Sequence, residues 1–225
     1  MSDSVIGDDL RAVKSYGASL ARRLQLKPAA NSSWDLLQQT AEAFQSAQTL
    51  EERWTVLVER LADVGANQLN YGIFALWTQA REQAPVQFLS TMSPDWLDYY
   101  ESERLDLHDL HAAIARERVA LPYCWGASGL DHLVDPGRRN AQRLAVEAGL
   151  RSSLHVPLFD PMNSRRAAGS FTVGSSLPEA QFFAAIAGHH AELIATVQLF
   201  HSLALADMRS NQLPGKPLTN RERDC

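Results

Sequence analysis

Trp96, Tyr100 and Asp109 are the side chains of this sequence best suited to holding a small neutral molecule. Trp96 and Tyr100 stand at positions i and i+4, so on a helix they share one face. An indole N–H only donates a hydrogen bond and an ionised carboxylate only accepts one, which suits a ligand carrying a carbonyl and an amide N–H. Taken alone, these three residues are better explained as ordinary core packing and helix capping than as a ligand site. Such aromatic pairs are commonly core, and Asp109 would then be the N3 residue of a helix capped by Asp106.

The end of the chain carries a second signal. Thr219 followed by Glu222 is a capping box, which indicates the start of a helix. The preceding residues, with Pro214 and Gly215, are typical of a linker. Because the sequence ends within the first turn of the predicted helix, we expect it to stop just inside a further domain.

Taken together, the two regions resemble a known family. Trp96, Tyr100, Asp109 and Trp125, in this order and near these spacings, resemble the N-terminal autoinducer-binding domain of LuxR-type quorum-sensing transcription factors. The closing Leu-Thr-x-Arg-Glu-Arg resembles the opening of that family's helix-turn-helix DNA-binding domain, and residues 148–158 and 170–173 are similar to its strands. The resemblance covers roughly residues 50 to 225.

The resemblance implies a role for each of these residues. Trp96 would donate to the lactone carbonyl of an N-acyl-homoserine lactone, and Asp109 would accept from its amide N–H. Tyr100 and Trp125 would be aromatic walls, and Thr172 a polar contact near the acyl chain. A buried Asp109 carboxylate without a donor would be unfavourable by roughly 1–3 kcal/mol, so a ligand N–H would stabilise it. The further candidate contacts are Met92, His111, Phe88, Tyr71 and Ala112.

Several positions depart from the family pattern. Met92 stands where a tyrosine is frequent, and His111 stands where a small hydroxyl residue is common. Leu110 replaces a proline and Ser153 replaces a glycine, which narrows the local backbone freedom. These changes affect the acyl side more than the head group. An aromatic, branched or otherwise unusual acyl group and a different neutral ligand therefore both stay open as alternatives.

Composition restricts the class of protein. The 225 residues are 45% hydrophobic and 21% charged, with a formal net charge of −5. Without a basic patch this segment is not expected to bind nucleic acid, so DNA would be contacted only through the missing C-terminal domain. Cys124 and Cys225 make no disulfide framework. In the absence of an apolar run long enough for a signal peptide or a membrane span, we expect a cytoplasmic protein with no membrane partner.

The pattern along the chain predicts one domain with flanking segments. We expect an N-terminal extension (1–33), an autoinducer-binding domain (34–210), a linker (211–217) and the first residues of a truncated DNA-binding domain (218–225). The predicted strands cover 69–77, 86–92, 121–125, 154–159 and 170–174. The predicted helices cover 33–48, 50–64, a segment opened by Ser93-Pro94, 106–118, 136–148 and 178–209. Because no regular helical crossovers join the strands, the fold class is α/β (α+β), an α/β/α sandwich over a five-stranded, mostly antiparallel sheet.

The last predicted helix has a broad apolar stripe. Its members recur at helical spacing: Ile186, Leu193, Val197, Phe200 and Ala204. The pattern fits a wide core contact or a dimer interface equally well, and the resemblance favours a homodimer.

Other functions are weaker alternatives. The sequence lacks the Gly-x-Ser-x-Gly, Gly-x-Gly-x-x-Gly and phosphate-loop motifs, so we expect no enzyme and no cofactor. His108 and His111 lack a third ligand, so no metal site is expected. The prediction is the ligand-sensing and dimerisation domain of a LuxR-type transcription factor that binds an N-acyl-homoserine lactone. The alternatives are an orphan regulator that senses another molecule or none, and a small-molecule enzyme that uses His111 and Asp109 as an acid–base pair.

Overall fold

One sheet of five strands organises the chain, in the order β2-β1-β5-β4-β3 with every neighbouring pair antiparallel. The computed structural model describes residues 8–9, 11–12, 35–73, 87–116, 121–160 and 163–212. The strands are β1 Gln68–Ile73, β2 Gln87–Ser90, β3 Tyr123–Gly126, β4 Ser152–Asp160 and β5 Asn163–Ser175. The predicted five-stranded antiparallel sheet is therefore confirmed.

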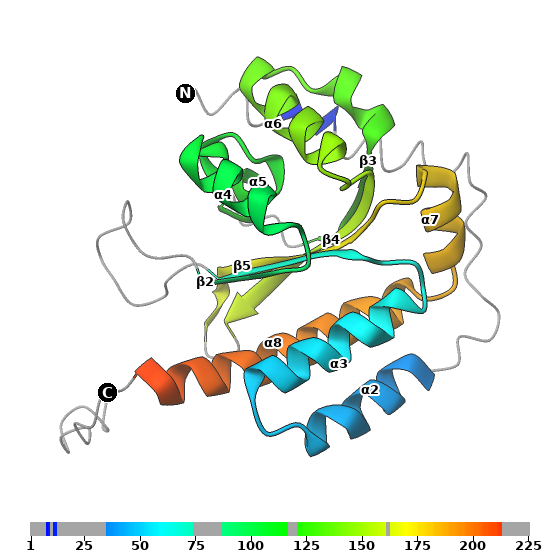
Figure 1. Ribbon diagram of the computed structural model, residues 1–225, viewed down its shortest axis with the longest axis vertical. Coiled ribbons are helices and arrows are strands. Elements are labelled where there is room, and N and C mark those ends of the chain that lie inside the picture. Colours follow the sequence, from blue (N-terminus) through cyan, green and yellow to red (C-terminus); the bar gives the residue numbers. More distant parts are fainter. Residues whose placement is uncertain are drawn as a thin grey trace.

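Helices cover both faces of this sheet (Figure 1). The helices on one side of the sheet are α2 Asp35–Ser46, α3 Leu50–Ala62 and α8 His190–Gln212. Those on the other side are α4 Pro94–Ser102, α5 Leu110–Arg116 and α6 Pro136–Glu147, with the short 3-10 helices η1 Leu105–Leu107 and η2 Ala127–His132. Helix α7, Glu179–Ile186, lies at one end. This is the predicted α/β/α sandwich.

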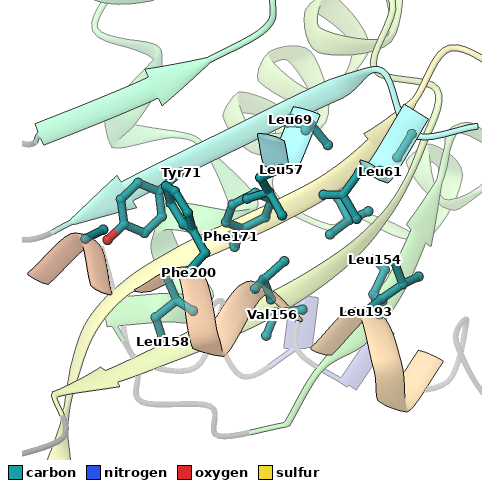
Figure 2. Packing of buried hydrophobic residues seen from close by; sticks show 14 of the residues in the cluster. Leu57, Leu61, Leu69, Tyr71, Leu154, Val156, Leu158, Phe171, Leu193 and Phe200 are labelled. Carbon is teal, nitrogen blue, oxygen red and sulfur yellow. The ribbon is translucent and has the colours of Figure 1, made fainter. Parts of the chain in front are cut away.

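The main core lies between the sheet and the layer of α2, α3 and α8. Figure 2 shows Tyr71 and Phe171 from the sheet packed beside Phe200 of α8. Side chains alternate between the two faces of a strand. Since Leu69 and Tyr71 point into this core, Asn70 between them points towards α4, α5 and α6.

Local signals start the helices where the sequence predicts. The Thr49 hydroxyl accepts from the backbone N–H of Glu52, whose side chain bonds back to Thr49, so the capping box of α3 is formed. Ser93 caps α4 and Asp135 caps α6, each with a proline directly after it. Gly149 follows α6 with φ of 108°, a left-handed conformation in which glycine avoids strain.

Two predicted helices differ in the structure. The segment 106–118 is divided into η1 and α5, because the Asp109 carboxylate binds the first N–H groups of α5 and so starts a new helix. Asp109 is thus not an N3 residue behind Asp106. The predicted helix 178–209 is also two helices, α7 and α8, separated at residues 187–189, where Gly188 lowers helix propensity.

The apolar stripe of the predicted last helix is divided between α7, which holds Ile186, and α8, and it belongs to the chain's own core. Ile186, Leu193, Val197, Phe200 and Ala204 are all 0% exposed within a single chain. Their prediction as a dimer interface is wrong, because they are already covered by the sheet and by α2 and α3. The alternative of a wide core contact is correct.

The ends of the chain are described only in part. In the N-terminal extension, Asp9 is buried and makes an ion pair with Arg138 of α6, at 2.7 Å between carboxylate and guanidinium. Trp34, Trp77, Cys225, most of the predicted linker and the predicted start of the DNA-binding domain lie outside the described residues. Within the described ranges, no helix has the length and apolarity needed to cross a membrane.

Candidate functional site

Helix α4 presents the predicted aromatic pair on one face. Ser93 accepts a hydrogen bond from the backbone N–H of Trp96 and sets the start of the helix. The rings of Trp96 and Tyr100 then meet edge to face, with centroids 6.0 Å apart and planes at 60°. Both residues are half-buried, as expected for a helix face turned towards another layer.

Asp109 stands between this pair and α5. One carboxylate oxygen accepts a hydrogen bond from the hydroxyl of Tyr100 at 2.8 Å. The other accepts the backbone N–H groups of His111 and Ala112, at 2.6 and 3.1 Å. The carboxylate therefore already has protein donors in the folded chain. Since an ionised carboxylate offers about four acceptor positions, three protein donors leave room for one more.

A row of polar side chains crosses the sheet beneath α5. Strand register places these residues side by side on all five strands: Tyr123, His155, Thr172, Asn70 and Ser90. We call this set the floor row. It faces the layer of α4, α5 and α6, because the adjacent strand residues point into the main core. The His155 Nδ1 atom lies 3.2 Å from the Thr172 hydroxyl, and the Ser90 hydroxyl donates to Asn70 at 2.7 Å.

His111 connects α5 to the floor row. Its ring stacks on His155 with centroids 4.7 Å apart and planes at 18°. It also meets Trp125 edge to face at 6.1 Å, and its Nδ1 lies 2.7 Å from the Tyr123 hydroxyl. These contacts position an imidazole and an indole over the sheet.

Burial keeps these groups uncharged. It lowers the pKa of His111, an effect that Asp109 partly opposes. Burial, with a smaller contribution from His111, holds the pKa of His155 well below its usual value. Burial and Asp109 raise the pKa of the Tyr123 phenol well above its usual value. At neutral pH the cluster therefore has two neutral imidazoles and a neutral phenol.

Met92 links the floor row back to α4. Its sulfur accepts from the Asn70 amide at 3.5 Å, and Trp96 packs against the small apolar cluster that contains Met92. The contacts thus join the helices α4 and α5 to the strands β1, β5 and β4 in a closed circuit. The circuit runs through Trp96, Met92, Asn70, Thr172, His155, His111, Asp109, Tyr100 and back to Trp96.

Four buried polar atoms on α5, β3 and β4, at or beside the floor row, have no hydrogen-bond partner among the described residues: His111 Nε2, Trp125 Nε1, the Ser153 hydroxyl and His155 Nε2. Further such atoms lie on or near α6, at His108, Arg138 and Gln142. Ser153 lies opposite Trp125 in the strand register. A buried polar group without a partner is unfavourable by roughly 1–3 kcal/mol. Their concentration here marks a place that favours a polar ligand group.

The structure brings most of the predicted site residues together, with two exceptions. Tyr71 lies on the opposite face of the sheet, where its hydroxyl is 3.0 Å from His201 Nδ1 and its ring packs on Phe200. Its prediction as a ligand contact is corrected, because the side-chain period of a strand turns Asn70, and not Tyr71, towards α4 and α5. Phe88 lies on the correct face by register but is 46% exposed.

Sequence reasoning missed four of the five floor-row residues. Asn70, Ser90, Tyr123 and His155 are polar residues within the strands, and each belongs to the floor row. That polarity is the signal that would have identified them. The sequence does not reveal the strand register that places these residues side by side.

The geometry gives little support to metal or acid–base chemistry. No group of three or more His, Cys, Asp or Glu side chains suited to a metal ion occurs in the part of the chain that the structure describes. Asp109 accepts from the backbone N–H of His111, whereas the His111 ring bonds to Tyr123. The two residues therefore do not form the carboxylate–imidazole hydrogen bond of an acid–base pair.

The family model described as the autoinducer binding domain matches residues 49–203. None of the proteins with curated descriptions matches the chain in sequence.

Solved structures share the fold at low identity. CepR2 from Burkholderia cenocepacia, an N-acylhomoserine lactone dependent LuxR family transcription factor, is 18% identical with a TM-score of 0.59, and the match covers 77% of this chain and 98% of CepR2. Escherichia coli SdiA is 17% identical with a TM-score of 0.61, over 84% of this chain and 74% of SdiA. SdiA in complex with octanoyl-rac-glycerol matches at 17% identity and a TM-score of 0.61, over 84% and 72% of the two chains.

Proposed function

This chain belongs to the autoinducer-binding domain family of LuxR-type regulators, and from its site we propose that it binds an N-acyl-homoserine lactone between the sheet and the layer of α4, α5 and α6. The observation that carries the proposal is the position of Tyr100. It contacts Trp96 through its ring and Asp109 through its hydroxyl, so a donor and an acceptor from different helices are held in one cluster.

The chemistry of the two ends matches the head group of such a ligand. The Trp96 indole N–H donates to the lactone carbonyl, and the remaining acceptor position of Asp109 takes the amide N–H. Because the Tyr100 hydroxyl and the start of α5 already hold the carboxylate, Asp109 is preorganised for this contact.

The acyl group would lie over the floor row. Met92 and Trp125 supply apolar surface, Thr172 and His111 supply polar atoms, and the first turn of α5 contributes Ala112. Met92 offers an adaptable apolar wall in place of a hydroxyl donor.

The direct test is to identify what the folded protein retains. The chain is expressed in a host that produces several acyl-homoserine lactones, purified, and its bound molecules are identified by mass spectrometry. We expect one lactone at near-equimolar occupancy, and its loss in Trp96→Phe, which keeps an aromatic ring but removes the indole N–H. Tyr99→Phe is the matched control, because Tyr99 lies on the same helix and is 42% exposed. Recovery of no lactone from wild type would contradict the proposal.

A second candidate is a different neutral ligand on the same site. It is favoured by the complex of SdiA with octanoyl-rac-glycerol, a neutral molecule of another class bound by a protein of the same fold. In the same experiment this candidate predicts a retained molecule with carbonyl and hydroxyl groups but no lactone.

We further propose that the protein acts as a homodimer in transcription regulation. CepR2, which shares this fold, is a LuxR family transcription factor, and the resemblance to that family favours a homodimer. The stripe of α8 is not available for the interface, because it is buried within one chain. Light scattering of ligand-bound protein should give a two-chain mass, and a one-chain mass at micromolar concentration would contradict the dimer.

A further inference from the structure

His111 and His155 stack face to face beside Trp125, with ring centroids 4.7 Å apart. We propose that they form, with Trp125 and Ser153, a second polar subsite, which selects an acyl group that carries a hydrogen-bond acceptor oxygen close to its amide. This inference rests on the proposed function, because it concerns the acyl part of the same ligand.

The hydrogen-bond partners of the two imidazole rings determine which nitrogen of each ring carries the proton and can donate it. The Tyr123 phenol is neutral and must donate its proton, and among the described contacts the acceptor at hand is His111 Nδ1, at 2.7 Å. A neutral imidazole that accepts at Nδ1 carries its proton on Nε2. His111 Nε2 is therefore a donor.

The same reasoning applies to His155. The Thr172 hydroxyl is 5% exposed, and its described hydrogen-bond contact is His155 Nδ1 at 3.2 Å. We assign Thr172 as the donor, because its hydroxyl is buried and this ring nitrogen is its described partner, and the proton of His155 then lies on Nε2 as well. Neither Nε2 atom has a hydrogen-bond partner among the described residues. Two N–H groups are thus left to donate, and each belongs to a ring whose other nitrogen is occupied.

Trp125 and Ser153 add to the same patch. Their side-chain donors, Nε1 and the hydroxyl, are likewise buried without a partner in the described part of the chain. Ser153 lies two residues before His155 on β4, hence on the same face, and Trp125 lies opposite Ser153 on β3. The edge contact of His111 with Trp125 completes the patch. It holds three N–H donors and one hydroxyl.

Because the patch offers several hydrogen-bond donors, it favours an acyl group that carries an acceptor oxygen. A plain hydrocarbon chain would cover these groups and leave them without partners, which is unfavourable. An oxo or hydroxyl oxygen would accept from them. His111 lies in the first turn of α5, whose N–H groups bind the Asp109 carboxylate. The acceptor is therefore expected in the part of the acyl group nearest the amide.

The first test needs only the wild-type chain. Calorimetry is run with N-octanoyl-, N-(3-oxooctanoyl)- and N-(3-hydroxyoctanoyl)-homoserine lactone, which share the head group and the chain length. We expect at least one of the oxygen-bearing ligands to bind about tenfold more tightly than the plain one, the scale of satisfying one buried donor. Equal affinities, or tighter binding of N-octanoyl-homoserine lactone, would overturn the subsite.

The second test assigns the preference to the rings. His155→Phe keeps an aromatic ring for the stack but removes both nitrogens, so the preference for oxygen should fall to about one third or less of its wild-type value. His111→Phe provides a second variant if the first does not fold. Tyr71→Phe is the matched control, because it removes a similar buried tyrosine–histidine hydrogen bond on the opposite face of the sheet. A preference that persists in both histidine variants, or that falls equally in Tyr71→Phe, would overturn the assignment.

The failure of this inference is distinguishable from the failure of the proposed function. If none of the three lactones binds wild type, the proposed ligand class is wrong and the subsite is rejected with it. If all three bind with equal affinity and Asp109→Asn weakens each of them, the ligand class stands and only the subsite is rejected.

Discussion

Replacing Asp109 separates its structural role from its role in ligand binding. In the structure the carboxylate accepts two N–H groups at the start of α5 and the hydroxyl of Tyr100. Asp109→Ala removes the helix cap, worth about 1 kcal/mol. It also leaves the Tyr100 hydroxyl without this partner, at about 1 kcal/mol. We therefore expect the unfolding free energy of the ligand-free protein to fall by about 2 kcal/mol.

The ligand contact adds a separate effect on affinity. A hydrogen bond to a charged group contributes about 1.5–3 kcal/mol, so Asp109→Ala should weaken lactone binding by about 10- to 150-fold. Asp109→Asn distinguishes the two roles. Its amide oxygen still caps α5, since Asn and Asp are similar N-cap residues. Its NH₂ group takes the place of the oxygen that accepts from Tyr100; it can donate to the Tyr100 hydroxyl instead, but it cannot accept the ligand N–H. Stability should stay near wild type while affinity falls.

The measurements are chemical denaturation without ligand and calorimetry with the lactone that wild type binds best. Asp98→Asn is the matched control, because it removes an exposed carboxylate from neighbouring α4 and should change neither quantity. Wild-type affinity in Asp109→Asn would refute the ligand contact. Loss of stability without loss of affinity in Asp109→Ala would mean that the carboxylate serves only to build α5.

Three further predictions follow from the packing and the titrating groups. Met92→Tyr should sharpen selectivity for straight acyl chains by adding a hydroxyl donor, and an unchanged ranking across a ligand panel would show that residue 92 does not contact the ligand. Val197→Glu should destabilise the chain by about 4 kcal/mol or more in denaturation, because it buries an unpaired charge in the main core; a well-folded variant with a changed oligomeric mass would instead restore the stripe as an interface. His111 and His155 have lowered pKa values when folded, so unfolding takes up protons below their unfolded pKa of about 6.5. Stability should be constant above that pH and fall as the pH drops through it, more shallowly in His155→Phe; an identical slope in the variant would contradict the assignment.

The sequence by itself determined the local features of this protein. Thr49, Ser93 and Asp135 start helices because each cap bonds to backbone atoms within three residues. Trp96 and Tyr100 share a face because i and i+4 are neighbours on any helix. The resemblance to the family rested on the order and approximate spacing of such residues, and the match over residues 49–203 confirms it.

Only the tertiary structure decided which of these residues meet. The floor row exists because hydrogen bonds between strands distant in sequence set one register, and a shift of one residue would turn each side chain to the opposite face. That rule separates Asn70, beneath the site, from Tyr71, in the core with Phe200. Packing against the sheet likewise buries the apolar stripe and stacks His111 on His155. Amphipathic periodicity specifies that a face will be covered, whereas the partner that covers it depends on non-local packing.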